Sequence, residues 1–76
     1  MKELVEYLVK SIVENPQEVL IAARENDDTL LMELKVSEDD LGRIIGKNGN
    51  TINAIRTVVQ AAATSHKKRA KLEVLS

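Results

Sequence analysis

The sequence has no cysteine and only one histidine, His66. Without cysteine there can be no disulfide, no thiolate metal site and no thiol nucleophile. His66 has no second histidine and no carboxylate at ligand spacing, so we expect neither a metal nor any other cofactor. No nucleophile–base pair or pair of catalytic carboxylates can be assembled from the remaining residues, which makes an enzyme the least supported class of function.

Aromatic residues are almost absent as well, because Tyr7 is the only one. Modules that stack bases on several aromatic side chains, such as RRM sheets and OB-folds, are therefore not favoured. A nucleic-acid site in this chain would have to rely on aliphatic contacts and on the phosphate backbone.

Long hydrophobic runs are also missing. No apolar stretch approaches about 18 residues, and Lys2, Glu3 and Glu6 interrupt the N-terminal segment. This pattern predicts neither a membrane span nor a secretory signal. We therefore expect a cytoplasmic protein.

What the sequence does contain is enough apolar side chains for one small folded domain. It has 76 residues, of which 43% are hydrophobic. A chain of this length buries only about 60–65% of its unfolded surface. We expect a single domain over residues 1–76 with modest stability.

Hydrophobic periodicity predicts three helices and three strands. Asn15-Pro16 should end the first helix, because the residue before a proline is displaced from helical backbone angles. The polar turn Asn26-Asp27-Asp28 should join two antiparallel strands. The expected elements are a helix over 2–14, strands over 18–25 and 29–36, helices over 38–45 and 51–65, and a strand over 70–75.

Ser37 and Asp40 have the spacing of a capping box at the start of the second helix. Glu38, Asp39 and Asp40 would also lie in its first turn, where the helix dipole favours acidic residues. Three consecutive acids could suggest a metal or catalytic site, but no partner ligand or base is near them in the sequence. We interpret them as helix-capping residues.

The stretch 44–52 places two glycines, Gly46 and Gly49, between two predicted helices. Glycine has no side chain to block approach to its backbone, and the free N–H groups at the start of the following helix favour an anion. Lys47 adds a positive charge, so the loop predicts a site for one phosphate. Apolar side chains form one helix face before the glycines and another after them: Leu41, Ile44 and Ile45, then Ile52, Ile55 and Val59.

The net charge of −1 conceals two oppositely charged halves. Residues 1–40 carry four basic and eleven acidic side chains, a net charge of −7, whereas residues 41–76 carry seven basic and one acidic, a net charge of +6. A charge run of this kind can simply be a solvated surface. Because the basic half begins at the glycine loop, we interpret it as support for binding a polyanion.

The run Ile45-Gly46-Lys47-Asn48-Gly49-Asn50-Thr51-Ile52 resembles the I-G-x-x-G-x-x-I signature of KH domains. The helix-first order of elements resembles the type II, bacterial arrangement. As a whole, the chain is similar to the small stand-alone bacterial KH proteins of the KhpA type. The resemblance implies an α+β fold, a type II KH domain of order α-β-β-α-α-β, in which helices pack on one face of a three-stranded sheet.

The resemblance also implies a binding mode, because the glycine loop of KH domains clamps about four single-stranded nucleotides beside a shallow apolar groove. Many relatives have Arg or Lys where this chain has Asn50, and this departure predicts a weaker hold on the backbone. The cluster Lys67-Lys68-Arg69 could add phosphate contacts or merely solvate the surface. The implied RNA-binding residues are Arg43, Ile45, Gly46, Lys47, Asn48, Gly49, Asn50, Ile52 and Arg56; Leu41 and Ile44 are further candidates for the groove wall, and each aliphatic residue could equally be core.

The implied partner is single-stranded RNA, and the implied role is that of an RNA chaperone or post-transcriptional regulator. The resemblance further implies a heterodimer with a larger multi-domain KH protein of the Jag type. Independently, the third helix carries a second stripe of small residues where a solvated face would carry Lys, Glu or Gln. The stripe is either a wide core face or the seam of a homodimer; we predict a homodimer through Ala54, Val58, Ala61 and Ser65.

Two other functions remain as alternatives. Two helices around a glycine-containing turn could form a helix-turn-helix reader of duplex DNA. Against this alternative, the second helix presents few basic residues, and the glycines would have no role. The third candidate is a protein-interaction module with a vestigial loop.

Overall fold

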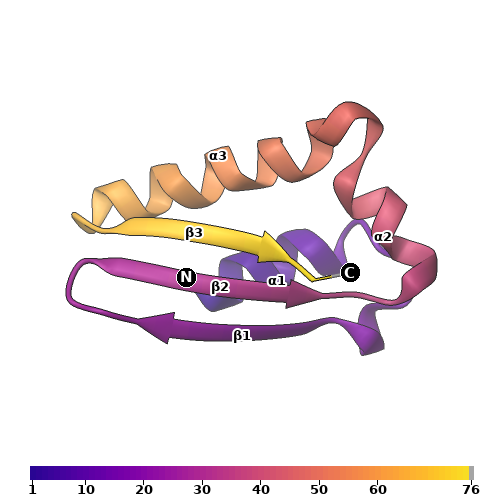
Figure 1. The fold of residues 1–76 in the computed structure, drawn as a ribbon, viewed down its shortest axis with the longest axis horizontal. Helices are drawn as coiled ribbons and strands as arrows, with labels where there is room; N and C mark the ends of the chain where they lie inside the picture. Colours follow the sequence, from indigo (N-terminus) through magenta and orange to yellow (C-terminus); the bar gives the residue numbers. More distant parts are fainter. Residues whose placement is uncertain (76) are drawn as a thin grey trace.

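The computed structural model describes residues 1–75 of the chain. Helices and strands follow one another in the predicted order α-β-β-α-α-β (Figure 1). Short 3-10 turns precede β1 and link α2 to α3. The helices are α1 (Lys2–Lys10), α2 (Glu38–Ile45) and α3 (Asn50–Ser65), the strands are β1 (Leu20–Glu25), β2 (Thr29–Lys35) and β3 (Arg69–Val74), and the 3-10 turns are Pro16–Glu18 and Lys47–Gly49.

The three strands form one mixed sheet with β2 in the centre. β1 and β2 pair antiparallel, whereas β3 pairs with β2 in parallel. Parallel neighbours need a long crossover connection, and here α2 and α3 supply it. The helices lie on one side of the sheet, and in Figure 1 α1 passes behind the strands. The predicted α+β fold with one covered sheet face is confirmed.

Alternation along the strands decides which side chains reach the core. Met32, Leu34 and Leu72 point toward the helices and are almost completely buried. The helices contribute apolar stripes at helical spacing to the same core. No helix within residues 1–75 is both long enough and apolar enough to cross a membrane. The buried hydrophobic residues are Val5, Val9, Val13, Met32, Leu34, Val36, Ile44, Ile52, Ile55, Val59, Ala63 and Leu72.

The first helix is shorter than the sequence predicts, because α1 ends at Lys10 rather than near residue 14. The N–H groups of Glu14 and Asn15, which would continue a helix, donate instead to the carboxylate of Asp40. A tertiary contact thus overrides the local periodicity here. The other predicted elements match the observed ones to within two residues at each end.

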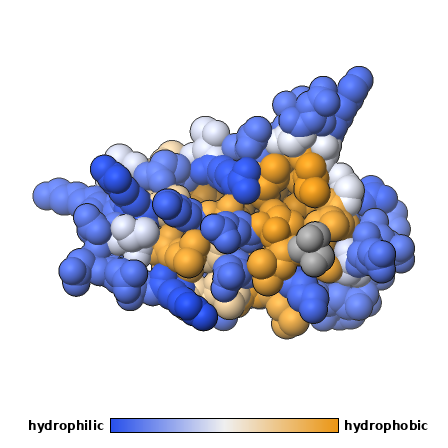
Figure 2. Space-filling model, viewed as in Figure 1, coloured by the Kyte–Doolittle hydropathy of each residue, from blue (hydrophilic) through white to orange (hydrophobic). Residues whose placement is uncertain are grey.

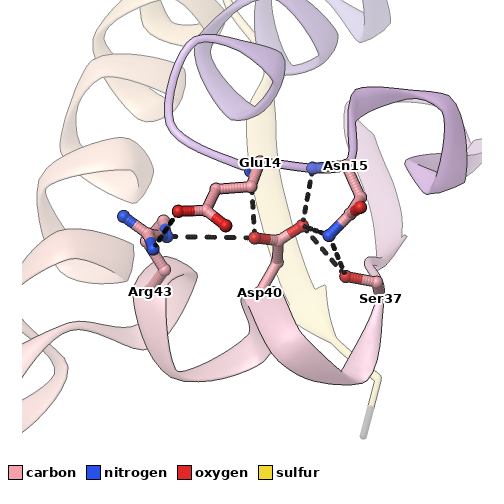
Figure 3. A network of polar contacts seen from close by, with 5 residues as sticks. All are labelled: Glu14, Asn15, Ser37, Asp40 and Arg43. Carbon is pink, nitrogen blue, oxygen red and sulfur yellow. Dashed lines mark hydrogen bonds and ion pairs between the residues drawn. The ribbon is translucent and has the colours of Figure 1, made fainter.

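Asp40 is a buried carboxylate that fastens the start of α2 to the segment after α1 (Figure 3). It is 1% exposed and accepts the N–H groups of Glu14 and Asn15, each at 3.0 Å. It also accepts the side-chain amide of Asn15 at 3.1 Å and the hydroxyl of Ser37 at 2.9 Å. These hydrogen bonds, the one from the Glu14 N–H above all, lower the pKa of Asp40 to about 2, although burial acts to raise it.

The capping-box interpretation is therefore wrong for Ser37 and Asp40. Within residues 1–75, no side-chain hydrogen bond caps the start of α2. The hydroxyl of Ser37 donates to the carboxylate of Asp40 instead. That carboxylate accepts the backbone N–H groups of two residues that lie 25 and 26 positions earlier in the chain. Glu38 and Asp39 remain exposed in the first turn of α2, as expected from the helix dipole.

Candidate nucleic-acid interface

The loop between α2 and α3 begins at a position that only glycine can occupy. Gly46 has φ 75° and ψ 176°, a combination that residues with a side chain essentially never adopt. A Cβ atom at this position would lie 2.7 Å from Cβ of Thr51 and 2.9 Å from its backbone nitrogen. The backbone of Gly46 therefore packs directly on the first turn of α3.

The next residues continue a left-handed turn. Asn48 and Gly49 have φ values of 57° and 76°, which asparagine and glycine tolerate better than other residues. A Cβ at Gly49 would meet only the side chain of Asn53, at 3.7 Å, so backbone conformation and not space requires glycine there. The turn leaves the side chains of Lys47 and Asn48 exposed.

This geometry can hold an oxyanion. α3 begins at Asn50, so its first N–H groups and the positive end of its dipole face the loop. Lys47 adds a formal charge, and the two glycines expose the loop backbone. One phosphate group of a nucleic-acid backbone matches the charge and the size of this site.

Of the residues predicted to line a groove beside the loop, only Ile45 lies clearly at the surface. It is 39% exposed, whereas Ile44 and Ile52 are 0% and 5% exposed. Leu41 is half-buried and packs against the core. Ile44 and Ile52 therefore anchor the two helices beneath the loop and offer no surface to a base.

A groove of about 380 Å³ lies between α3 and β3. Arg56 and Gln60 reach from the helix to the edge of the strand. The Nε of Arg56 donates to the carbonyl of Leu72 at 3.0 Å, and the N–H of Ala70 donates to Oε1 of Gln60 at 3.1 Å. Arg56 also donates to Oδ1 of Asn53 at 3.3 Å. These bonds hold its guanidinium in the groove, and the Cα of Arg56 lies about 9 Å along α3 from Asn50, where the helix begins.

Arg43, predicted to contact phosphate, is engaged in the network around Asp40 (Figure 3). Its Nη2 donates to Oε1 of Glu14 at 2.8 Å, and its Nε lies 3.8 Å from Oδ1 of Asp40. These carboxylates compete with a phosphate for the same donors. Arg43 is therefore a weaker candidate for RNA contact than Lys47 or Arg56.

The basic turn between α3 and β3 lies against the acidic β1–β2 hairpin. The N–H of Arg69 donates to the carbonyl of Asp28 at 2.8 Å, and Lys68 forms an ion pair with Glu25. The fold thus brings together charges that the sequence separates. Partial neutralisation at this end of α3 makes the turn a poorer phosphate site than its lysines alone suggest.

The residues predicted to form a dimer seam are all exposed on α3. Val58 is 46% exposed on a helix whose opposite face is buried. Ala54, Ala61 and Ser65 accompany it on the side turned away from the core. The structure therefore leaves the four predicted seam residues at the surface.

Two residues of the site were not identified from the sequence, namely Thr51 and Gln60. Thr51 packs on Gly46, and its position two residues after the second glycine is the only sequence signal for that role. Gln60 bonds to the backbone of Ala70. No sequence signal identifies Gln60, because its contact joins two segments through the tertiary fold.

Comparison with known proteins agrees with the geometry of the loop and the order of the elements. A family model described as "KhpA/KhpB, KH domain" matches residues 2–74. The chain is 44% identical over 75 residues to the RNA-binding protein KhpA of Clostridium perfringens, covering 99% of this chain and 100% of the relative. It is 41% identical over 75 residues to the proteins of the same name from Halalkalibacterium halodurans and Listeria monocytogenes, with 99% of each chain covered. The chain therefore belongs to the KhpA/KhpB family of KH domains.

Proposed function

We propose that the chain binds single-stranded RNA through the loop Gly46–Gly49. The observation that carries this proposal is the contact between Gly46 and Thr51, which fixes an exposed left-handed turn at the start of α3. Because glycine has no side chain, a sugar–phosphate backbone can approach the backbone of this turn more closely than it could if other residues stood there. The similar proteins named above are RNA-binding proteins by name, which favours RNA as the ligand.

In the proposed complex, Lys47 and the first N–H groups of α3 hold one phosphate. The exposed amide of Asn48 can donate to the same phosphate or to its neighbour. The strand then passes Ile45 and follows α3 toward Arg56, whose Cα lies about 9 Å along the helix from its first residue. The bases lie over the groove between α3 and β3.

A site of this kind should bind RNA weakly and with little sequence preference. Tyr7, the only aromatic residue, is 72% exposed on α1, so no base can stack on an aromatic ring in the α3–β3 groove. Backbone contacts are sequence-independent by nature. This behaviour suits an RNA chaperone or a post-transcriptional regulator, acting in the cytoplasm as a single KH domain over residues 1–76.

We further propose that the chain pairs through α3, either with a second copy or with a larger KH protein of the Jag type. The exposed seam Ala54, Val58, Ala61 and Ser65 supports this proposal, as does a family description that names both KhpA and KhpB. Pairing would place two glycine loops on one particle. Avidity could then compensate for a weak single site.

Competition binding tests the proposal against its alternatives. A labelled single-stranded RNA is bound to the protein and then displaced by unlabelled RNA, or by duplex DNA of the same length. We expect duplex DNA to compete at least about tenfold less well, because α3 is packed on the sheet and its N-terminal turn faces the loop. Equal competition by duplex DNA would favour the helix-turn-helix alternative, and no binding of RNA would favour a protein-interaction module.

A further inference from the structure

Asn53 is exposed on the first turns of α3, and its side-chain amide is held in one orientation. Nη1 of Arg56 donates to Oδ1 of Asn53 at 3.3 Å. Because a guanidinium has donors and no acceptor, it must meet the oxygen of the amide and not the nitrogen. Nε of the same guanidinium donates to the carbonyl of Leu72 at 3.0 Å. Asn53 is therefore tied to β3 through Arg56, with its Nδ2 turned away from this contact.

The free end of the Asn53 amide lies beside the glycine loop. A Cβ atom on Gly49 would meet Nδ2 of Asn53 at 3.7 Å. Among the hydrogen bonds formed within residues 1–75, Asn53 uses its Oδ1 and its backbone carbonyl, and Arg56 uses Nε and Nη1. The donors of Nδ2 are thus open to a ligand that is held at the loop.

Asn53 also lies between the two positions proposed to contact phosphate. A rise of about 1.5 Å per residue places its Cα about 4.5 Å along α3 from Asn50, and the Cα of Arg56 about 9 Å from the same residue. A strand whose phosphate is held at the start of α3 passes Asn53 before it reaches Arg56. The group next to a phosphate along the strand is the ribose, so a sugar lies opposite Asn53.

The surface around the loop favours the same arrangement. Figure 2 shows the loop as a hydrophilic projection at the upper right, above a hydrophobic patch. Phosphates lie at the charged loop, whereas the flat faces of bases lie over apolar side chains. The ribose joins a base to its phosphates, so it lies between these two surfaces.

We propose that Asn53 binds the 2′-hydroxyl of the nucleotide held at the loop and gives the site a preference for RNA over single-stranded DNA, a role that rests on the RNA binding proposed above. Nδ2 of Asn53 donates to the hydroxyl oxygen. The 2′-hydroxyl is the group by which a protein distinguishes RNA from DNA. The neighbouring phosphates have the cations Lys47 and Arg56, whose charge-assisted hydrogen bonds are stronger than those of a neutral amide.

Arg56 then has a second role, because it positions Asn53. Its planar guanidinium holds the Leu72 carbonyl and the Asn53 amide at the same time. A lysine at this position would keep the positive charge but would lack the fixed fork of donors. The orientation of the Asn53 amide therefore depends on arginine and not on charge alone.

Affinities for single-stranded RNA and DNA of the same sequence test the proposal. A sequence of adenine, cytosine and guanine alone makes the two strands differ only at the 2′ position. We expect the parent chain to bind the RNA about fivefold more tightly, which corresponds to roughly one hydrogen bond. Asn53→Ala should weaken binding of the RNA about fivefold and binding of the DNA less than about twofold. Asn26→Ala, at an asparagine in the β1–β2 turn, is the matched control and should change neither affinity.

Three results would overturn the sugar contact: a parent chain with no preference for RNA, equal weakening of RNA and DNA binding by Asn53→Ala, or no weakening of either. Equal weakening would mean that Asn53 contacts a phosphate. The loop variant Lys47→Asp with Asn48→Asp tests RNA binding at the loop separately. If that variant loses affinity while Asn53→Ala keeps the preference for RNA, the loop site stands and the sugar contact fails.

Arg56→Lys tests the positioning role. It should lower the ratio of RNA to DNA affinity as Asn53→Ala does, because the amide is no longer held in one orientation. The slope of log affinity against log salt concentration should stay the same, since the number of cations that meet phosphate is unchanged. An unchanged ratio in a folded Arg56→Lys chain would show that Arg56 does not position Asn53.

Discussion

Gly46 and Thr51 are packed so closely that the glycine loop and the first turn of α3 form one unit. A Cβ on Gly46 would lie 2.7 Å from Cβ of Thr51 and 2.9 Å from its backbone nitrogen. The loop is thus set in place before any ligand arrives. Preorganisation of this kind lowers the entropic cost of binding, which matters for a site that holds only two or three phosphates.

Replacing the two glycines should have unequal effects on stability. Gly46→Ala should lower the free energy of unfolding by about 2–4 kcal/mol, because backbone strain adds to a steric conflict with Thr51. Gly49→Ala should lower it by only about 1–2 kcal/mol, because that site has a left-handed backbone but room for a methyl group. Urea unfolding of both variants measures the difference. Equal losses would show that the contact with Thr51 does not constrain the loop.

Stability should decline in acid because of Asp40. Its pKa is lowered from 3.8 to about 2 in the folded protein. A carboxyl group with a lower pKa in the folded state stabilises the fold above its unfolded-state pKa, and this contribution is lost as the pH falls toward its folded-state pKa. We therefore expect the free energy of unfolding to fall between about pH 4 and pH 2.

The variant Asp40→Asn isolates this effect, and Glu38→Gln on the same helical turn serves as its control. Asp40→Asn should be less stable at neutral pH, because the N–H groups of Glu14 and Asn15 lose an ionised acceptor. Its stability should also change less between pH 4 and pH 2 than that of the parent, whereas Glu38→Gln should follow the parent. A parent-like acid profile for Asp40→Asn would assign the acid sensitivity to other groups.

The order and type of the elements could be predicted because their signals are local. Alternation in β2 and the two glycines after α2 each act over a few residues. The role of Asp40 could not be predicted, because its partners Glu14 and Asn15 lie 26 and 25 residues away. The spacing of Ser37 and Asp40 fits a capping box equally well, so only tertiary structure distinguishes the two roles.

The candidate site could be predicted in part for the same reason. The spacing of the two glycines was enough to predict an exposed turn that carries Lys47. The apolar stripe of a helix, however, does not distinguish core residues from residues that line a groove, because both follow the same periodicity. Ile44 and Ile52 therefore proved to be core, while Ile45 is at the surface. The pairing of Lys68 with Glu25 likewise depends on the placement of β3 beside the hairpin.

The salt dependence of RNA binding should be shallow. Contact with two or three phosphates predicts a slope of about −1.5 to −2 in a plot of log affinity against log salt concentration, at about −0.7 per phosphate for single strands. The basic turn should contribute little, because Lys68 is paired with Glu25. Titrations at several salt concentrations measure the slope. A value steeper than about −5 would mean that the whole basic half binds RNA and that the loop is a minor contact.

Association through α3 can be examined by sedimentation equilibrium of the parent chain and of its variants. The dimer should be lost in Val58→Asp, which places a charge in the exposed seam of α3. Val58→Thr, which is similar in shape and uncharged, should retain it. If the parent chain is already monomeric at tens of micromolar, α3 does not form a homodimer.

The most direct measurement is the affinity for single-stranded RNA of a chain carrying both Lys47→Asp and Asn48→Asp. Both side chains are exposed, so the variant should remain folded while two carboxylates oppose the phosphate at the N-terminus of α3. The matched control carries Lys67→Asp and Asn26→Asp, the same change in charge at the far end of α3. We predict at least about tenfold weaker binding for the loop variant and less than about threefold for the control. Equal weakening in both would show that binding follows net charge, and unchanged affinity in a folded loop variant would contradict the phosphate clamp itself.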